Sequence, residues 1–303
     1  MEIVVEAYKE RVLHMSMDRL QEAIRKRKNP TVLELLGDLP PQLLEQADSP
    51  AQAYETFCRE LLTALAGEIP ALRLSFARFA LMGSQGLAVL ERTLKLAKKL
   101  GYYVLLDGPE LLRPSAARQA AQSLLGKDGP FPCDGVILGV YAGSDVVEPF
   151  LPYCREEKRT VFLVSRTANR SAPELQDLIT GSRLVHTAAA DLALRFGEQG
   201  VGKRGYTPVG LMVSAGSADS IRQMRSKYSQ QFLLLDGFDT PRANAKNCSY
   251  CFNKYGWGGA VCSGAEISGA WQSVEGDGVD YVQQALEAAQ RMKRNLNRYI
   301  TMV

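Results

Sequence analysis

The hydrophobic and polar positions of this chain follow two patterns in alternation. Short apolar runs rich in β-branched residues are separated by longer segments with helical periodicity, the order expected of repeated strand and helix units. Eight runs predict strands, at Thr31–Leu36, Leu72–Phe76, Tyr102–Leu106, Gly135–Gly139, Thr160–Ser165, Val209–Ser214, Gln231–Leu235 and Gly258–Ser263. The periodic segments predict helices at Ala51–Leu65, Gln85–Leu100, Ser115–Leu125, Asp145–Tyr153, Thr187–Glu198, Ala218–Tyr228 and Val279–Tyr299.

The predicted strands are hydrophobic along their whole length, which indicates a parallel sheet covered on both faces. Eight such units close into a (β/α)8 barrel, so we expect an α/β fold with a single barrel domain at 15–303 and an N-terminal extension at 1–14. An open doubly wound sheet is the alternative. The first strand, however, is followed by LELLGDLP and not by a glycine-rich dinucleotide-binding turn. The connection 171–208 is long enough to carry extra structure.

Composition narrows the class of protein. Hydrophobic residues make up 46% and charged residues 23% of the 303 residues, which excludes wholesale disorder and fibrous repeats. The net charge of +3 is too small for a nucleic-acid-binding footprint. The N-terminus does not resemble a secretory signal, and no apolar run approaches the ~20 residues that span a bilayer. We therefore expect a cytoplasmic protein with neither a nucleic-acid nor a membrane partner.

One acidic residue, Asp107, follows the third predicted strand, and one basic residue, Arg73, lies on the second. Asp107 has three interpretations: a binding carboxylate in a pocket, a cap for the helix that begins near Ser115, or an ion pair with Arg73. The planar guanidinium of Arg73 suits carboxylates and phosphates, so it is a candidate anion clamp. The ion pair with Asp107 is the favoured interpretation of Arg73.

Three cysteines, Cys248, Cys251 and Cys262, have a spacing that resembles a metal-ligand set. A fourth ligand is missing nearby, because the two histidines, His14 and His186, lie far away in sequence. We therefore favour the interpretation as three small residues of a loop over the two alternatives, a metal site and a redox-active C-x-x-C pair.

Four aromatic residues, Tyr250, Phe252, Tyr255 and Trp257, precede the last predicted strand. They are either a stacking surface for a base or sugar, or packing residues; packing is the commoner role of aromatic residues that lead into a barrel strand.

Several segments at predicted strand ends resemble one family in order and spacing. They are NPTVLELLGDLP, LRLSFARFALMGSQGLAVLERT, YYVLLDGPELLRPSAARQ, VYAGSDVVEPFL, RTVFLVSRTANRSAPELQ, PVGLMVSAGS and WGGAVCSGAEI. Together they are similar to the longer bacterial orotidine 5′-phosphate decarboxylases, over about residues 15–271. The most specific parts are GSQGLAVLERT and the pair YAGSDVVEPFL and TANRSAPELQ.

The resemblance implies a catalytic tetrad of Lys, Asp, Lys and Asp, three of which are changed here. Arg73 stands at the first lysine, Asp107 at the first aspartate, Pro109 at the central lysine and Leu112 at the last aspartate. In the family a carboxylate destabilises the substrate carboxylate, and a lysine protonates the carbanion left by carbon dioxide. Proline has no proton to transfer and arginine is effectively always protonated, so we expect this reaction to fail. No cofactor is expected.

The ligand contacts implied by the resemblance are also altered. Leu36 stands at the ribose-binding aspartate and Ala168 at the serine that reads the pyrimidine, whereas Thr167 and Asn169 are kept. The phosphate loop reads LLDGFDTPRANAKN, in which Asp236 and Asp239 would repel a phosphate. The phosphate-clamping arginine falls at Ala265. The remaining candidates for ligand contacts are Arg242, Lys246 and Ser263.

These observations lead to three hypotheses about function. The first is a catalytically degenerate relative linked to pyrimidine nucleotide metabolism. It would bind a nucleotide or another anionic small molecule, or have a regulatory role. The second keeps catalysis, either as an active lyase of the family or with Asp107 as general base for a different anionic substrate. The third is an interaction subunit. Dimers of the family complete each active site with the last aspartate of the neighbour, so the resemblance implies a homodimer or a heterodimer with an active decarboxylase.

Overall fold

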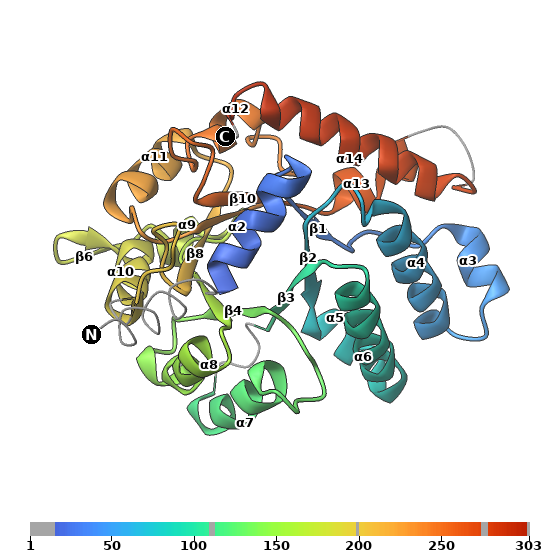
Figure 1. Cartoon of the computed structure of the whole chain (residues 1–303), viewed down its shortest axis with the longest axis horizontal. Coiled ribbons are helices and arrows are strands. Elements are labelled where there is room, and N and C mark those ends of the chain that lie inside the picture. The colour runs from blue at the N-terminus through green and yellow to red at the C-terminus, as the bar shows by residue number, and fades with distance from the viewer. Residues whose placement is uncertain (1–15, 109–112, 198–199, 274–277, 302–303) are drawn as a thin grey trace, which may run out of the picture.

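In a computed structural model of the chain, which describes residues 16–108, 113–197, 200–273 and 278–301, eight parallel strands close into a barrel surrounded by helices (Figure 1). The strands follow one another around the barrel in the order β1, β10, β9, β8, β5, β4, β3 and β2. Their bounds are β1 Thr31–Glu34, β2 Ala71–Ser75, β3 Tyr103–Asp107, β4 Gly135–Gly139, β5 Thr160–Val164, β8 Val209–Ser214, β9 Leu233–Asp236 and β10 Gly259–Ser263. The predicted (β/α)8 barrel and its eight strands are confirmed.

The helices that surround the barrel are α2 Ser16–Arg27, α3 Pro41–Gln46, α4 Pro50–Leu65, α5 Phe76–Ala80, α6 Gly83–Lys99, α7 Pro114–Leu125, α8 Leu151–Glu156, α9 Pro173–Gln176, α10 Val185–Gly197, α11 Ala218–Lys227, α12 Ala245–Ser249, α13 Ala265–Ser268 and α14 Tyr281–Asn297. Six of them, α4, α6, α7, α10, α11 and α14, correspond to predicted helices. Short 3₁₀ turns lie at Ser144–Val146, Glu148–Phe150 and Ala270–Ser273. No helix of the described ranges combines the length and the apolar character that crossing a membrane requires.

Two segments differ from the sequence-based expectations. The predicted helix Asp145–Tyr153 is wrong as one element: the chain forms two 3₁₀ turns and then begins α8. Pro149 and Pro152 explain the break, because proline lacks the backbone N–H that a continuous helix needs beyond its first turn. The connection 171–208 carries the expected extra structure, namely α9, α10 and a hairpin of β6 Ile179–Thr180 and β7 Arg183–Leu184.

Alternate residues of each strand enter two different cores. One set faces the barrel interior and the other packs beneath the helices, as the period of two along a strand requires. The amino-terminal end of the barrel is closed by α2, whose Met17, Leu20 and Ile24 are fully buried in the interior core. The carboxylate of Asp18 accepts hydrogen bonds at 2.9 Å from two consecutive backbone N–H groups, of Lys203 and Arg204.

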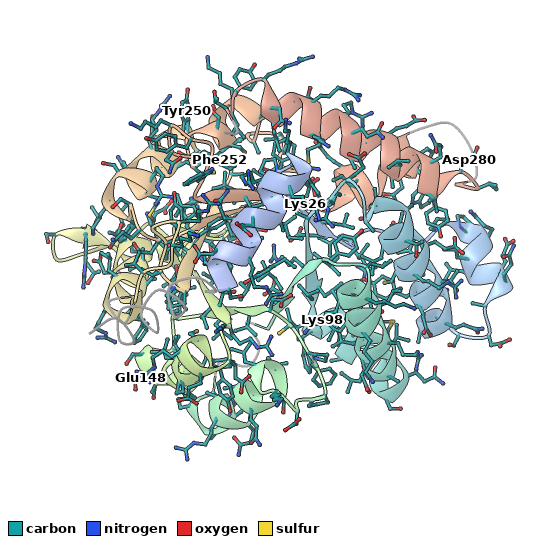
Figure 2. All side chains as sticks on the ribbon, in the orientation of Figure 1. Lys26, Lys98, Glu148, Tyr250, Phe252 and Asp280 are labelled. Atoms are coloured by element: carbon teal, nitrogen blue, oxygen red, sulfur yellow. The ribbon has the colours of Figure 1, made fainter. Side chains whose placement is uncertain are left out.

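The basic run at the end of α2 lies on the surface of this closed end. Figure 2 shows Lys26 on the last turn of α2 and Lys98 on α6. Both side chains are at helix C-termini, where a cation suits the negative end of the helix dipole. With the amino-terminal end closed by α2, the carboxyl ends of the strands are the face on which this fold places ligand sites.

Candidate functional site at the barrel mouth

Four charged side chains converge at the carboxyl ends of β1, β2, β3 and β9. This mouth cluster consists of Glu34, Arg73, Asp107 and Asp236. Each of them comes two residues after a residue of the interior core, so the alternation along the strand turns it into the barrel. The preceding interior residues are Val32, Ala71, Leu105 and Leu234.

Arg73 is the centre of the mouth cluster. Its Nε donates a 2.9 Å hydrogen bond to Asp107 Oδ2, and its Nη2 donates to the same oxygen. Its Nη1 donates to Asp236 Oδ1 at 2.6 Å and also to Glu34 Oε1. Four hydrogen bonds to carboxylates therefore engage a group that has five N–H donors. The Arg73 side chain is only 13% exposed, so the ion pair with Asp107 considered from the sequence is present and is one of three.

Negative charge exceeds positive charge within the mouth cluster. Burial raises the pKa of Glu34 to about 7; Arg73 opposes this effect, and Asp236 and Asp107 add to it. Burial also raises the pKa of Asp107, again against the influence of Arg73. For Arg73 burial acts to lower the pKa, but the three carboxylates outweigh burial and raise it, so the guanidinium stays charged. Near neutral pH the cluster therefore holds Arg73 as a fixed cation and Glu34 as a group that exchanges a proton.

A buried oxygen of the cluster lacks a hydrogen-bond partner among the residues that the structure describes, namely Asp107 Oδ1. A buried acceptor without a donor is costly, and such groups gather at functional sites. Asp107 thus combines a buried oxygen that lacks a partner in the described ranges with a raised pKa.

A further carboxylate of the mouth, Asp239, lies on the loop after β9, where barrels of this fold frequently bind phosphate. Its Oδ2 accepts hydrogen bonds from the backbone N–H groups of Gly264 and Ala265, at 3.0 and 2.9 Å. Its Oδ1 accepts from Ser263 Oγ at 3.2 Å. In (β/α)8 barrels the loops after the last two strands frequently bind phosphate, and here those strands are β9 and β10. A carboxylate of the chain itself therefore takes the donors that a phosphate would need.

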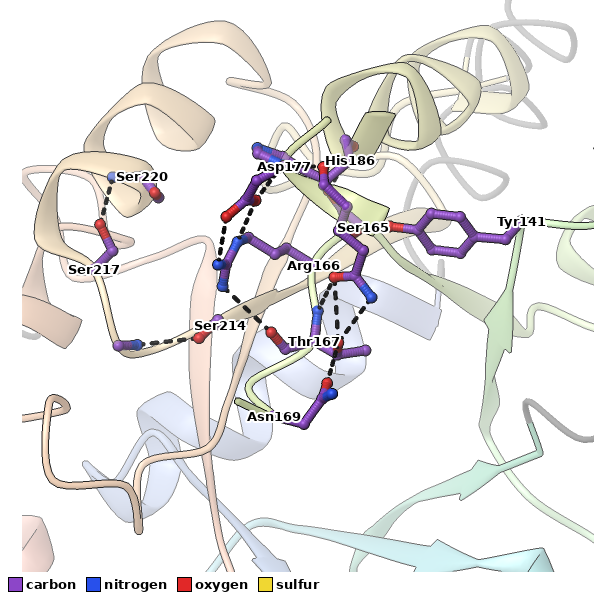
Figure 3. Close-up of polar contacts among 12 residues, drawn as sticks. Tyr141, Ser165, Arg166, Thr167, Asn169, Asp177, His186, Ser214, Ser217 and Ser220 are labelled. Carbon is purple, nitrogen blue, oxygen red and sulfur yellow. Dashed lines mark hydrogen bonds and ion pairs between the residues drawn. The ribbon is translucent and has the colours of Figure 1, made fainter. Parts of the chain in front are cut away.

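The loop after β5 holds two of the predicted ligand contacts in a network of its own (Figure 3). Thr167 Oγ1 donates to Asn169 Oδ1 at 2.5 Å, and the Thr167 backbone N–H donates to Gln176 Oε1 at 2.8 Å. The same loop is tied to α9 by two parallel hydrogen bonds from Arg166 to Asp177, at 2.9 and 2.8 Å. Thr167 and Asn169 are therefore bound to each other and to nearby residues of the same loop and helix.

The remaining predicted site residues lie in different surroundings or outside the described ranges. Ser263 is buried at the end of β10 and binds Asp239. Arg242 lies on the loop after β9 with an exposed side chain, and among the described residues it forms no hydrogen bond or ion pair with the other candidates. Pro109 and Leu112 lie outside the described residues, as does the N-terminal extension.

The cysteines that resembled a metal-ligand set are separated. Cys262 points into the barrel interior, whereas Cys248 and Cys251 are buried in the core beneath the helices. In the ranges that the structure describes, no group of three His, Cys, Asp or Glu side chains is placed to hold a metal ion.

The aromatic segment before β10 lies at the closed end of the barrel, away from the mouth. The Trp257 ring packs against the interior core near α2, and the backbone N–H of Gly258, next to it, donates to Gln21 of α2. Phe252 is buried, while Tyr250 at the end of α12 packs partly against the core beneath the helices (Figure 2). The Arg222 guanidinium lies 3.6 Å from the centre of the Tyr250 ring. These positions fit the packing interpretation.

Sequence reasoning missed Glu34. The signal was present, because Glu34 is the one charged residue of TVLELL and follows Val32 by two positions. Applying the strand alternation would have turned it inward. Its partner also follows from chain order, because the consecutive strands β1 and β2 pair so that Glu34 lies beside Arg73.

Comparison with known proteins agrees with the fold and the motifs. No family model matches the chain. Among curated proteins, orotidine 5′-phosphate decarboxylase of Clostridium novyi is 26% identical over 285 residues, which cover 93% of this chain and 98% of that protein. The enzyme of the same name from Rhodopirellula baltica is 28% identical over 227 residues, or 74% of this chain and 75% of that protein.

Solved structures show the same barrel. A putative orotidine 5′-phosphate decarboxylase from Streptomyces avermitilis has a TM-score of 0.75 at 23% identity, covering 95% of this chain and 96% of that one. A putative orotidine-monophosphate decarboxylase from Toxoplasma gondii has a TM-score of 0.74 at 22% identity, with 95% and 99% covered. At this identity the structures show the fold alone. Over most of its length the chain is similar to curated bacterial orotidine 5′-phosphate decarboxylases, at 26% and 28% identity.

Proposed function

We propose that this protein is a pseudoenzyme, which keeps the barrel of its relatives and does not decarboxylate orotidine 5′-monophosphate. The observation that carries this proposal is the environment of Arg73. Three carboxylates of the chain itself bind the cation that would otherwise face a substrate. Arg73 is therefore a structural ion-pair partner and not a free anion clamp.

Protonation by a cationic side chain that can release its proton is the first requirement of the family's reaction that the mouth cluster does not meet. The carbanion left by decarboxylation has to be protonated, and the cluster contains one cationic donor, Arg73. Its raised pKa holds the proton more tightly than an ordinary guanidinium does. Arginine already releases no proton at neutral pH, and Pro109 stands where the resemblance places the proton-donating lysine.

Substrate binding is the second requirement. Orotidine 5′-monophosphate carries a carboxylate and a phosphate, and both would enter a mouth with surplus negative charge. The backbone donors of Gly264 and Ala265 are held by Asp239, so a phosphate would have to displace a carboxylate that belongs to the fold. What remains is a binding or regulatory role, and the link to pyrimidine nucleotide metabolism rests on analogy with the relatives.

Titration with uridine 5′-monophosphate tests whether the mouth is closed to nucleotides. Isothermal titration calorimetry of the purified chain is expected to show no saturable binding at the mouth. The variant Asp239→Asn, which removes one negative charge there, should bind better than the wild type. Asp219→Asn, which makes the same change at an exposed position of α11, should not. Wild-type binding with a dissociation constant below about 1 mM that Asp239→Asn alters would contradict the proposal, because that response would locate the nucleotide at the mouth.

A further inference from the structure

A second candidate binding site lies on the outside of the barrel, between α14 and the segments that follow β9 and β10. The α14 groove is a cavity of about 510 Å³. It is lined by Phe238, Ala243, Asn244, Ala245, Lys246, Glu266, Ala288, Arg291, Met292, Asn295, Arg298 and Tyr299. Figure 1 shows α12 beside the C-terminal end of α14. A second cavity of similar size shares the lining residues Glu266, Arg291 and Asn295 with the first.

The rim of the α14 groove is rich in positively charged donors. Lys246, Arg291 and Arg298 are exposed, and none forms an ion pair within the described part of the chain. Some cations elsewhere on the surface are paired, as Arg92 is with Glu55 and Lys293 with Glu68. Unpaired cations gathered at one cavity create a positive potential that attracts anions.

Two amides add to the donors of the groove. The Oδ1 of Asn244 accepts a 2.9 Å hydrogen bond from the Asn247 backbone N–H and caps α12, which leaves its NH₂ group without a hydrogen bond to the described residues. Asn295 lies one turn beyond Arg291 on the same face of α14. Glu266 is the one acidic residue of the lining.

The spacing along α14 sets the size of the anion. Arg291 and Arg298 are seven residues apart, about 10 Å along a helix axis, and Lys246 faces them from α12. A single small anion cannot contact all three cations, whereas a chain of phosphate groups can. Between the cations, Phe238, Met292 and the alanines give an apolar floor, and Tyr299 is half exposed at one end. A cavity of this volume lies within the range of small-molecule sites.

We propose that the α14 groove binds a nucleoside polyphosphate, with its phosphates against Lys246, Arg291 and Arg298 and its base on the apolar floor. The proposal does not depend on the absence of catalysis. It gives a physical link to the barrel mouth, because Phe238 lies between Asp236 and Asp239 on the loop after β9. A ligand that contacts Phe238 touches the loop that holds Arg73 and the Gly264 backbone in place.

Calorimetric titration with adenosine and uridine 5′-triphosphates, at low salt, tests this site. Saturable binding of at least one of them to the wild type is expected. Arg291→Gln should weaken it roughly tenfold or more, the value of one hydrogen-bonded charge. The matched control is Arg294→Gln, which removes the same charge from an exposed position of α14 that does not line the groove, and a change below about twofold is expected. Both variants should keep the wild-type melting temperature.

Absence of saturable binding by the wild type would overturn the proposal, as would equal losses in Arg291→Gln and Arg294→Gln. The same pair of variants distinguishes nucleotide binding in the groove from nucleotide binding at the mouth. Nucleotide binding that Arg291→Gln weakens belongs to the groove. Binding that Arg291→Gln leaves intact takes place elsewhere and counts against the groove. If Asp239→Asn alters that binding, the nucleotide binds at the mouth.

Discussion

The variant Arg73→Met is expected to lose about 3–5 kcal/mol of unfolding free energy near pH 8. Methionine has a similar length and removes the cation, which leaves Glu34, Asp107 and Asp236 buried together with no positive partner. The loss should shrink near pH 5, because the carboxyl groups can then take up protons in place of the missing charge. Urea denaturation at the two pH values, followed by circular dichroism, measures both effects.

The matched control for Arg73 is Arg92→Met. Arg92 also binds a carboxylate through two hydrogen bonds, to Glu55 at 2.5 and 2.7 Å, but its side chain is 55% exposed. A solvent-exposed pair contributes about 1 kcal/mol or less. If Arg73→Met does not fold, Arg73→Lys keeps the charge without the planar fork and should show an intermediate loss. Equal, small losses at Arg73 and Arg92 would mean that the mouth cluster is not a structural centre.

Replacing Glu34 by glutamine is expected to stabilise the protein above about pH 7 and to leave it nearly unchanged near pH 5. Burial raises the pKa of Glu34 from 4.5 to about 7, so the folded state holds the proton more tightly than the unfolded state. The stability that this proton confers is present below pH 4.5 and is lost as the pH rises to about 7. The full shift corresponds to about 3 kcal/mol, an upper value because Asp107 and Asp236 share the proton.

Unfolding free energies of the wild type and Glu34→Gln between pH 5 and pH 8 give this comparison. The difference in favour of Glu34→Gln should grow with pH to about 1–3 kcal/mol. Glu45→Gln, at an exposed position of α3, removes the same charge and should show a flat difference. A flat difference for Glu34→Gln as well would show that Glu34 is an ordinary ionised carboxylate in the folded state.

The barrel could be predicted from the sequence because its signal is local. Uninterrupted apolar runs such as Tyr103–Leu106 and Val161–Val164 mark strands covered on both faces, and parallel strands separated by helices leave few alternatives. The breaks near Pro149 and Pro152 were missed although their signal was also local, since proline forbids one continuous helix there.

The mouth cluster could be predicted only in part because its contacts join distant strands. Arg73 and Asp107 lie on consecutive strands, so their pairing follows from chain order. Asp236 contacts Arg73 across the barrel interior, although the two residues are 163 positions apart in the chain. No periodicity of the sequence predicts that contact. The sequence also indicated that Asp239 would repel a phosphate, whereas the structure shows a more specific role, in which its carboxylate binds the backbone donors of the loop after β10.

The central claim, that the chain's own carboxylates have replaced the substrate at the barrel mouth, is tested most directly by assaying the decarboxylation of orotidine 5′-monophosphate. The purified chain and the Clostridium novyi enzyme would be followed side by side through the loss of substrate absorbance. We predict no rate above the enzyme-free reaction for this chain, under conditions in which the Clostridium novyi enzyme consumes the substrate. Turnover by this chain that Asp107→Asn abolishes would contradict the account, because it would show that the mouth cluster performs the chemistry that its ion pairs are here inferred to prevent.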